Sequence, residues 1–224
     1  MAELMILRHA ERKRISNLHE ALHVKITHKG RDDARALGKR MSKFFNGEGM
    51  EVMASQLDRC VETARSFASG YGKDAKYIGT EQTGNLSYLF PGMSAYMNHD
   101  ICCESALADV YGEIVLSCPR MFEHDYAGTM RKWLSGEFNG ILISPIEIYG
   151  DVQHIAKKSM GKRLVLFTSD IQISIMCALQ GMEEFAERRP GYLHGMQTSN
   201  FWKGKWKMFR PDELEEMNQS GLPG

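Results

Sequence analysis

The feature that most constrains the fold is the alternation of short apolar segments with amphipathic segments of helical periodicity. The clearest apolar segment is 163–168, which reads Arg-Leu-Val-Leu-Phe-Thr, and similar segments span 3–7 and 50–54. Runs of this length and composition are typical of strands buried on both faces of a sheet. We therefore predict a buried strand for each of the three.

Segments of helical periodicity separate these strands along the chain. Apolar side chains recur every three or four positions over 30–45 and 59–71, which indicates helices with one buried face. Polar residues that can cap a helix precede both, and we expect Thr27 to cap the first and Ser55 the second. Further helices are predicted at 151–160 and 171–179.

Strands that alternate with helices imply an α/β fold. We predict three layers, with a mostly parallel central sheet between helices on both faces. Weaker signals add strands at 76–79 and 205–209. The stretch 80–145 is irregular, and we expect it to be an insertion over the functional site. No linker composition divides the chain, so we expect one domain over 1–224.

The overall charge is balanced, which argues against polyanionic partners. Lys and Arg number 28, as do Asp and Glu, so the formal net charge is zero. We therefore expect neither nucleic acid nor a membrane surface as a partner. The five cysteines are irregularly spaced and fit neither a disulfide framework nor a zinc site. No signal peptide or membrane span is recognisable, so we expect a cytoplasmic protein.

Polar side chains follow three of the predicted strands. Arg8-His9 comes after the first, Ser55 to Arg59 after the second, and Ser169-Asp170 after the strand at 163–168. In open α/β sheets, ligands bind outside the carboxyl ends of the strands. We therefore expect these three segments to converge on one site.

The residue types in these segments suit phosphoryl chemistry. The guanidinium of Arg8 can bond two phosphoryl oxygens at once, and a neutral imidazole at His9 can attack phosphorus in line. Arg59, near a helix N-terminus, would add a second cation. Taken singly, Arg8-His9 is better explained as part of an exposed loop and the Arg59 segment as a capped surface helix, and only their combination favours an anion site.

Taken together, the motifs resemble those of the histidine phosphatase superfamily, which includes phosphoglycerate-mutase-like enzymes and acid phosphatases. The resemblance spans nearly the whole chain, and the first seventy residues carry most of it. The matching motifs, in the order of the family, are Arg8-His9-Ala10-Glu11, Thr27-His28-Lys29-Gly30 before a helix with Leu37-Gly38, and Ser55-x-Leu57-x-Arg59-x-x-Glu62-Thr63-Ala64.

The resemblance implies roles for particular residues. His9 would be the nucleophile, and Arg8 and Arg59 would bind the phosphoryl oxygens. The segment 80–145 would form the variable region that sets the substrate. A carboxylic acid would protonate the leaving oxygen: the candidates are Asp170, placed as in acid phosphatases, and Glu104, Asp109 and Glu113, placed near the acid of the mutase-like branch.

One position departs from the family pattern. Ser169 stands where a second histidine, which donates to the phosphoryl oxygens, is expected. Losing such a donor costs roughly 10²–10³ in rate. Three explanations are open: an active phosphatase with a rearranged pocket, a non-catalytic member that still binds a phosphorylated ligand, or an artificial replacement. In the first, Ser169 would join the phosphate site and a histidine could be recruited from elsewhere, the candidates being His194, His124 and His99.

The leading hypothesis is therefore a phosphomonoester hydrolase that forms a phosphohistidine at His9. It would need no metal and no organic cofactor, and its ligand would be a small phosphorylated substrate or a phosphate or sulfate anion. The alternative is a pseudophosphatase, while a mutase would require the same acid and base groups. Fifteen methionines are equally compatible with a soft core and with an apolar surface that a homodimer would bury.

Overall fold

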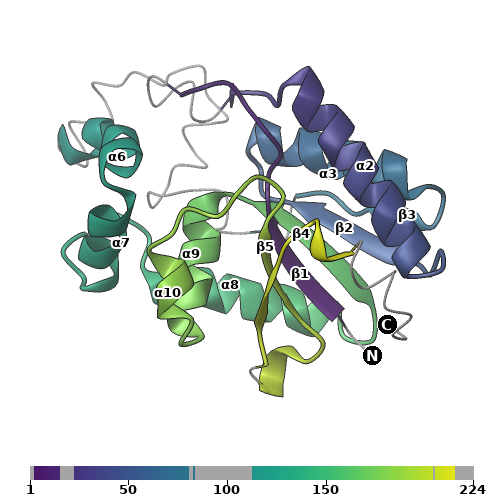
Figure 1. Cartoon of the computed structure of the whole chain (residues 1–224). Helices are drawn as coiled ribbons and strands as arrows, with labels where there is room; N and C mark the ends of the chain where they lie inside the picture. The colour runs from purple at the N-terminus through teal and green to yellow at the C-terminus, as the bar shows by residue number, and fades with distance from the viewer. Residues whose placement is uncertain (1–2, 16–22, 81–82, 84–112, 204, 215–224) are drawn as a thin grey trace.

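A mixed β-sheet forms the centre of the protein in the computed structural model (Figure 1). The structure describes residues 3–15, 23–80, 83, 113–203 and 205–214. Within these residues the sheet has six strands, in the order β3-β2-β4-β1-β5-β6. They are β1 (Glu3–Arg8), β2 (Met50–Ala54), β3 (Ala75–Tyr77), β4 (Arg163–Thr168), β5 (Gly195–Thr198) and β6 (Lys207–Phe209).

The first four strands are parallel, as the sequence predicts. β4 lies between β1 and β2, with Arg8 opposite Thr168 and Ala54 opposite Phe167. β5 and β6 continue the sheet beyond β1 in antiparallel orientation. Helices cover both faces of a parallel sheet because each crossover connection returns over it. The apolar segments at 3–7, 50–54 and 163–168 are accordingly buried almost throughout.

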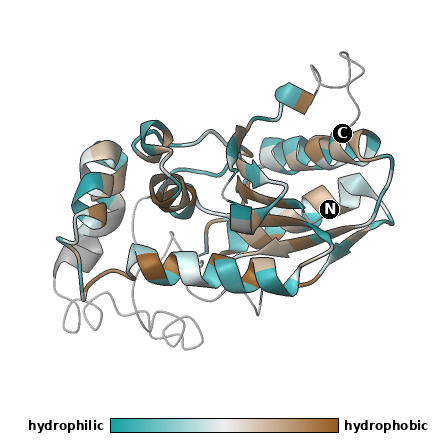
Figure 2. Cartoon of the chain, turned by 90° about the horizontal axis from the view of Figure 1, so that it is seen from below, coloured by the Kyte–Doolittle hydropathy of each residue, from teal (hydrophilic) through white to brown (hydrophobic). Residues whose placement is uncertain are grey.

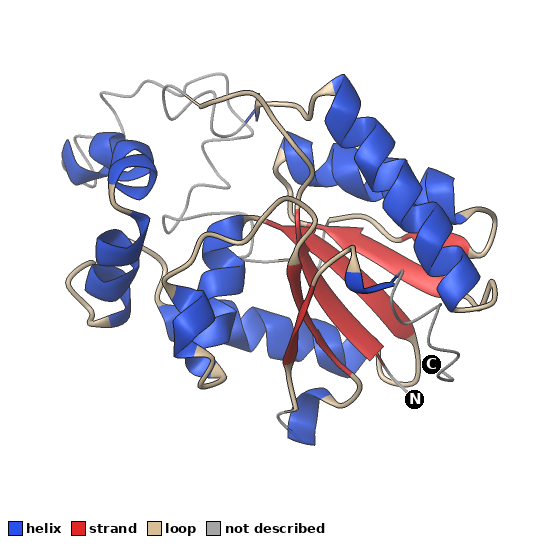
Figure 3. Ribbon diagram, viewed as in Figure 1, coloured by secondary structure: helices blue, strands red, loops and turns tan. Residues whose placement is uncertain are grey.

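Helices lie on both sides of the sheet (Figures 2 and 3). On one side, α2 (His28–Phe44) packs against α3 (Asp58–Tyr71), which contacts β2, β3 and β4. On the other, α9 (Asp170–Leu179) contacts β1 and β5, with α8 (Pro145–Lys158) beside it. The predicted three-layer α/β fold is confirmed.

The middle of the chain contributes two helices outside the three layers (Figure 1). They are α6 (Glu113–His124) and α7 (Tyr126–Leu134). α7 contacts α9, and the Tyr126 hydroxyl lies 2.9 Å from the Ser174 hydroxyl. Residues 84–112, which make up much of the predicted insertion, lie outside the described part of the chain.

Three details of the sequence prediction are wrong. Ser55 does not cap α3, because the N-cap is Leu57, which makes no side-chain cap bond. α8 begins at Pro145, not at 151, because Ser144 and Glu147 form a reciprocal capping box. β5 was not predicted: it is only four residues long and begins with a glycine.

The remaining described elements are short. α10 (Glu183–Ala186) follows α9, and a 3₁₀ helix, η2 (Phe201–Lys203), follows β5. Among the described residues, no helix combines the length and apolarity needed to cross a bilayer.

Candidate active site

The three segments singled out in the sequence meet at the carboxyl edge of the sheet. The His9 amide donates to the Thr168 carbonyl at 2.9 Å, and the Ser55 amide donates to the Phe167 carbonyl at 2.9 Å. These bonds continue the β1–β4 and β2–β4 ladders past the strand ends. The predicted convergence is therefore confirmed at the level of the backbone.

His9 is buried, with 1% of its surface exposed. Its Nδ1 lies 2.8 Å from the Ala10 carbonyl oxygen, which can only accept, so the proton is assigned to Nδ1 and Nε2 keeps its lone pair. Burial lowers the pKa of His9 well below its usual value, and the charges of Arg59 and Arg8 lower it further. The ring is therefore neutral at pH 7 and nucleophilic at Nε2.

Arg8 is held from three sides. Its Nη1 donates to the Pro190 carbonyl at 2.5 Å, and its Nη2 pairs with the Asp170 carboxylate at 3.1 Å. Its guanidinium carbon also lies 4.3 Å from the centre of the Tyr192 ring, within cation–π distance. Each terminal nitrogen still has a second hydrogen to donate. This geometry therefore orients Arg8 and leaves hydrogen-bond donors for a ligand.

Arg59 reaches the same region from the first turn of α3, and 7% of its surface is exposed. Thr63, one turn later, donates from its hydroxyl to the Arg59 carbonyl at 2.6 Å and accepts from the Ala10 amide at 3.0 Å. Thr63 thus ties the loop after β1 to the helix that carries Arg59. This tie explains why a threonine belongs to the motif around Arg59.

Glu11 and Glu62, the carboxylates of the two motifs, are structural. Glu11 accepts from the Thr27 hydroxyl at 3.0 Å, and Glu62 accepts from the Ile26 amide at 3.2 Å. Gly30 completes this junction, because a Cβ there would lie 2.4 Å from the Glu11 carbonyl oxygen. These residues fix the loop after β1 against α2 and α3.

Ser169 occupies the N-cap position of α9 and is 4% exposed. Its hydroxyl donates to Oε1 of Gln172 and caps no backbone amide of the helix. Ser169 therefore lies at the edge of the sheet where the resemblance places it, but its one hydroxyl hydrogen is directed at Gln172. Its role as a phosphate ligand stays a prediction.

Asp170 begins α9 and is a buried ion-pair partner. Its Oδ2 accepts from Arg189 Nε at 2.5 Å and pairs with Arg8 at 3.1 Å. Burial by itself would raise the pKa of Asp170, but Arg8 and Arg189 hold it well below its usual value. In this arrangement the side chain is a carboxylate at neutral pH, and its role as a proton donor stays a prediction.

Ion pairs extend from Asp170 across the site to residues that the sequence analysis did not place there. Arg189 also binds Glu123 of α6 at 3.0 Å, and Arg12 lies 3.6 Å from the same carboxylate oxygen. The sequence shows Arg12 only as part of a basic cluster, and it carries no local signal for Arg189 or Glu123. Contacts between distant segments alone bring them together.

The charges of this cluster do not balance. Arg8, Arg12, Arg59 and Arg189 supply four positive charges, against two negative ones from Asp170 and Glu123. With His9 neutral, these four arginines outnumber the two carboxylates. A positive cluster in which Arg8 and Arg59 are buried favours binding of an anion.

The remaining sequence candidates do not join the described cluster. Glu104, Asp109 and His99 lie outside the described residues, and the Glu113 side chain is not described. His124 is exposed at the end of α6 and lines a separate pocket. His194 contributes its carbonyl, which accepts from the Arg8 amide at 2.8 Å. Among the described residues, no group of His, Cys, Asp or Glu forms a metal site.

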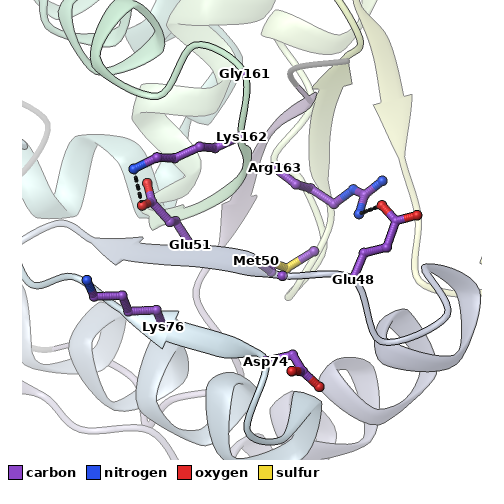
Figure 4. A pocket seen from close by; sticks show the side chains of 9 residues that line it. Glu48, Met50, Glu51, Asp74, Lys76, Gly161, Lys162 and Arg163 are labelled. Atoms are coloured by element: carbon purple, nitrogen blue, oxygen red, sulfur yellow. Dashed lines mark hydrogen bonds and ion pairs between the residues drawn. The ribbon is translucent and has the colours of Figure 1, made fainter.

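A second charged region lies at the opposite, amino edge of the sheet (Figure 4). A pocket of about 610 Å³ there is lined by residues that include Glu48, Glu51, Lys162 and Arg163. Lys162 binds Glu51 at 2.5 Å, and Arg163 binds Glu48 at 2.8 Å. These charges satisfy one another, so the region lacks the excess charge found around His9.

Comparison with known proteins bears on the family resemblance and on the fold. Residues 4–81, which contain Arg8, His9 and Arg59, match the family model of the histidine phosphatase superfamily (branch 1). The resemblance to histidine phosphatases is confirmed over these residues. A search of curated proteins finds none that matches the chain.

Solved structures share the fold of this protein over nearly the whole chain. Phosphoserine phosphatase from Entamoeba histolytica, in complex with 3-phosphoglyceric acid, aligns with a TM-score of 0.54 at 16% identity, covering 94% of this chain and 96% of that one. Phosphoglycerate mutase from Bacillus anthracis aligns with a TM-score of 0.55 at 11% identity, covering 97% and 96%. Mycobacterial glucosyl-3-phosphoglycerate phosphatase with inorganic phosphate aligns with a TM-score of 0.53 at 15% identity, covering 93% and 95%. At such identities the likeness shows the fold.

Proposed function

We propose that this protein hydrolyses a phosphomonoester through a phosphohistidine at His9. The observation that carries the proposal is the state of His9 itself: a buried, neutral imidazole whose Nδ1 is bonded to the Ala10 carbonyl, with the charges of Arg8 and Arg59 acting on it. A neutral imidazole with one free nitrogen is the form that can attack phosphorus. The solved phosphatases of this fold bind phosphoglyceric acid and phosphate, which supports the same ligand class.

The first step forms a bond between Nε2 of His9 and phosphorus and breaks the ester P–O bond. Arg8 and Arg59 stabilise the negative charge on the phosphoryl oxygens, which is the largest contribution that a fixed site can make. The alcohol leaves with the electron pair of the broken bond and takes up a proton. In the second step, water attacks phosphorus, and His9 is released with inorganic phosphate.

The proton for the leaving oxygen needs a donor. Asp170 is ion-paired to Arg8 and Arg189, so we expect it to be a poor donor near neutral pH. Glu104 and Asp109, from the mutase-like position, remain the proposed acids. Without any acid, turnover would depend on how readily the alcohol leaves unprotonated.

The second candidate is a protein that binds phosphorylated ligands without turnover. It is favoured by Ser169, whose hydroxyl is engaged by Gln172. In such a protein, Arg8 and Arg59 would still hold the phosphoryl group, while the charge of the transition state would lack the donor that the family places after β4.

Phosphate release from 4-nitrophenyl phosphate, measured from pH 4.5 to 8, tests the two. The hydrolase reading expects turnover in the wild type and none in His9→Ala, with a phosphohistidine detected by mass spectrometry after an alkaline quench. No turnover in the wild type, with inorganic phosphate still bound in calorimetry, supports the binding protein. Ser169→His then shows whether one donor restores activity, by roughly 10²–10³-fold.

A further inference from the structure

The loop formed by residues 187–194 closes one side of the candidate site. Its Pro190 carbonyl accepts from Arg8 at 2.5 Å, and its Arg189 binds Asp170 at 2.5 Å. Its Tyr192 ring lies 5.8 Å from the His9 ring, centre to centre, and 4.3 Å from the guanidinium carbon of Arg8. Tyr192 therefore borders the space in which Arg8 and His9 would meet a phosphoryl group.

Tyr192 differs from the groups around it in exposure. Arg8, His9 and Arg59 are 7% exposed or less, whereas Tyr192 is 37% exposed. A phosphoryl group bound by the buried arginines would direct its ester oxygen outward, since the buried side is occupied by protein. The substituent on that oxygen would then pass the open part of the Tyr192 ring. An aromatic ring in this position favours a flat apolar partner.

The chemistry of the leaving group points the same way. Asp170, the buried carboxylate whose charge acts on His9, is ion-paired to Arg8 and Arg189. A phenol has a pKa of about 10, whereas water and simple alcohols ionise with pKa values of roughly 16. A phenolate therefore leaves phosphorus with far less help from an acid than an alkoxide does.

We propose that Tyr192 is a specificity-determining residue that stacks on the ring of an aryl phosphate monoester. The proposal rests on the proposed function, because it takes the phosphoryl group to be held by Arg8 and Arg59. His9 Nε2 forms the P–N bond as the P–O bond to the aryl group breaks, and the phenolate leaves with the electron pair and is protonated by water.

The test compares two non-hydrolysable ligands of similar size, phenylphosphonate and cyclohexylphosphonate, by calorimetry. One has a flat ring and the other a puckered ring, while both carry the same phosphoryl group. The wild type is expected to prefer phenylphosphonate. Tyr192→Leu is expected to lower this preference by about 2- to 12-fold, the contribution of an aromatic pair, and Tyr192→Phe to retain it.

The ratio of the two affinities isolates stacking from other effects of the substitution. Losing the contact between Tyr192 and Arg8 would weaken both ligands alike and leave the ratio unchanged. An unchanged ratio in Tyr192→Leu would thus overturn the proposal, as would an equal loss in Tyr192→Phe. Tyr149→Leu, which removes a tyrosine stacked on Phe201 in another part of the molecule, is the matched control and is expected to retain the ratio.

These binding measurements do not depend on turnover. A Tyr192-dependent preference without release of phosphate from 4-nitrophenyl phosphate would support the aryl site and contradict the hydrolase. Turnover that needs His9, with no such preference, would support the hydrolase and contradict the aryl site. Competition by free phosphotyrosine and by a phosphotyrosine peptide distinguishes a small aryl phosphate from one carried on a protein.

Discussion

Charged side chains cluster at both edges of the sheet. The two clusters differ in burial and in the balance of positive and negative charges. At the amino edge, Lys162 is paired with Glu51 (Figure 4). Its side chain is 55% exposed, so water also solvates its charge. At the carboxyl edge, Arg8 and Asp170 are each 7% exposed in their side chains. There the guanidinium groups outnumber the carboxylates by two, counting the described residues.

The difference shows what separates a binding site from a solvated surface. Exposed ion pairs contribute about 0–1 kcal/mol and impose little on the neighbouring structure. Buried charges lose their hydration and must be matched by other buried charges or by a ligand. The position of the charge excess, more than the number of charged residues, distinguishes the carboxyl edge from the amino edge.

The largest effect is expected from removing the proposed nucleophile. His9→Ala should lower phosphate release from 4-nitrophenyl phosphate by at least roughly 10³-fold, because no phosphohistidine can form. Circular dichroism and thermal unfolding check that the variant is folded. Residual activity within tenfold of the wild type would assign the chemistry to another group.

The next effect concerns the ion pairs that hold the site together. Asp170→Asn should destabilise the protein by about 3–5 kcal/mol at pH 7, because Arg8 and Arg189 lose a buried partner. Urea unfolding of both proteins measures the difference. A decrease in the free energy of unfolding of less than about 1 kcal/mol would mean that the ion pairs of Asp170 contribute no more than the exposed ion pairs of the amino edge.

The same pair predicts how stability changes with acidity. The pKa of Asp170 is lower in the folded protein than in the unfolded chain, where it is about 3.9. The contribution of Asp170 to stability is therefore complete above about pH 4. It is lost as the pH falls toward the pKa of Asp170 in the folded protein. The stability difference between wild type and Asp170→Asn should be constant from pH 5 to 8 and shrink below about pH 4.

Affinity for inorganic phosphate should distinguish the two edges directly. Arg59→Met should weaken phosphate binding by about 10- to 100-fold, since charge-assisted hydrogen bonds to the phosphoryl oxygens are lost. Arg163→Met at the amino edge is the matched control, because it removes the same group from a balanced cluster. Equal loss in both variants would move the phosphate site away from His9.

The smallest effect is expected at the amino edge itself. Lys162→Met should change the free energy of unfolding by less than about 1 kcal/mol, and added salt should reduce the change, because the ion pair is exposed. Urea unfolding at low and high ionic strength measures both. A larger change in the free energy of unfolding that does not depend on salt would mean that the charges of the amino edge also stabilise the fold.

Much of the fold could be read from the sequence because its signals are local. The strand at 163–168 was predicted with its observed bounds, and so was β2. Their continuous apolar runs indicate burial on both faces of the sheet, even when the neighbouring strands are not known. The start of α8 also had a local signal, the Ser144-Pro145-x-Glu147 capping box, which the apolar periodicity alone did not show.

The sequence by itself determined the alternation of strands and helices, and hence the edge at which Arg8, His9 and Arg59 meet. The tertiary structure decided what surrounds them. Arg189 and Tyr192 reach the site from a loop, and Glu123 reaches it from the inserted helix α6. No periodicity or motif in the sequence predicts these positions. Arg8 and Pro190 lie 182 positions apart yet share a hydrogen bond. Such contacts depend on how whole elements pack, because no local pattern encodes the distance between segments that are remote in the chain.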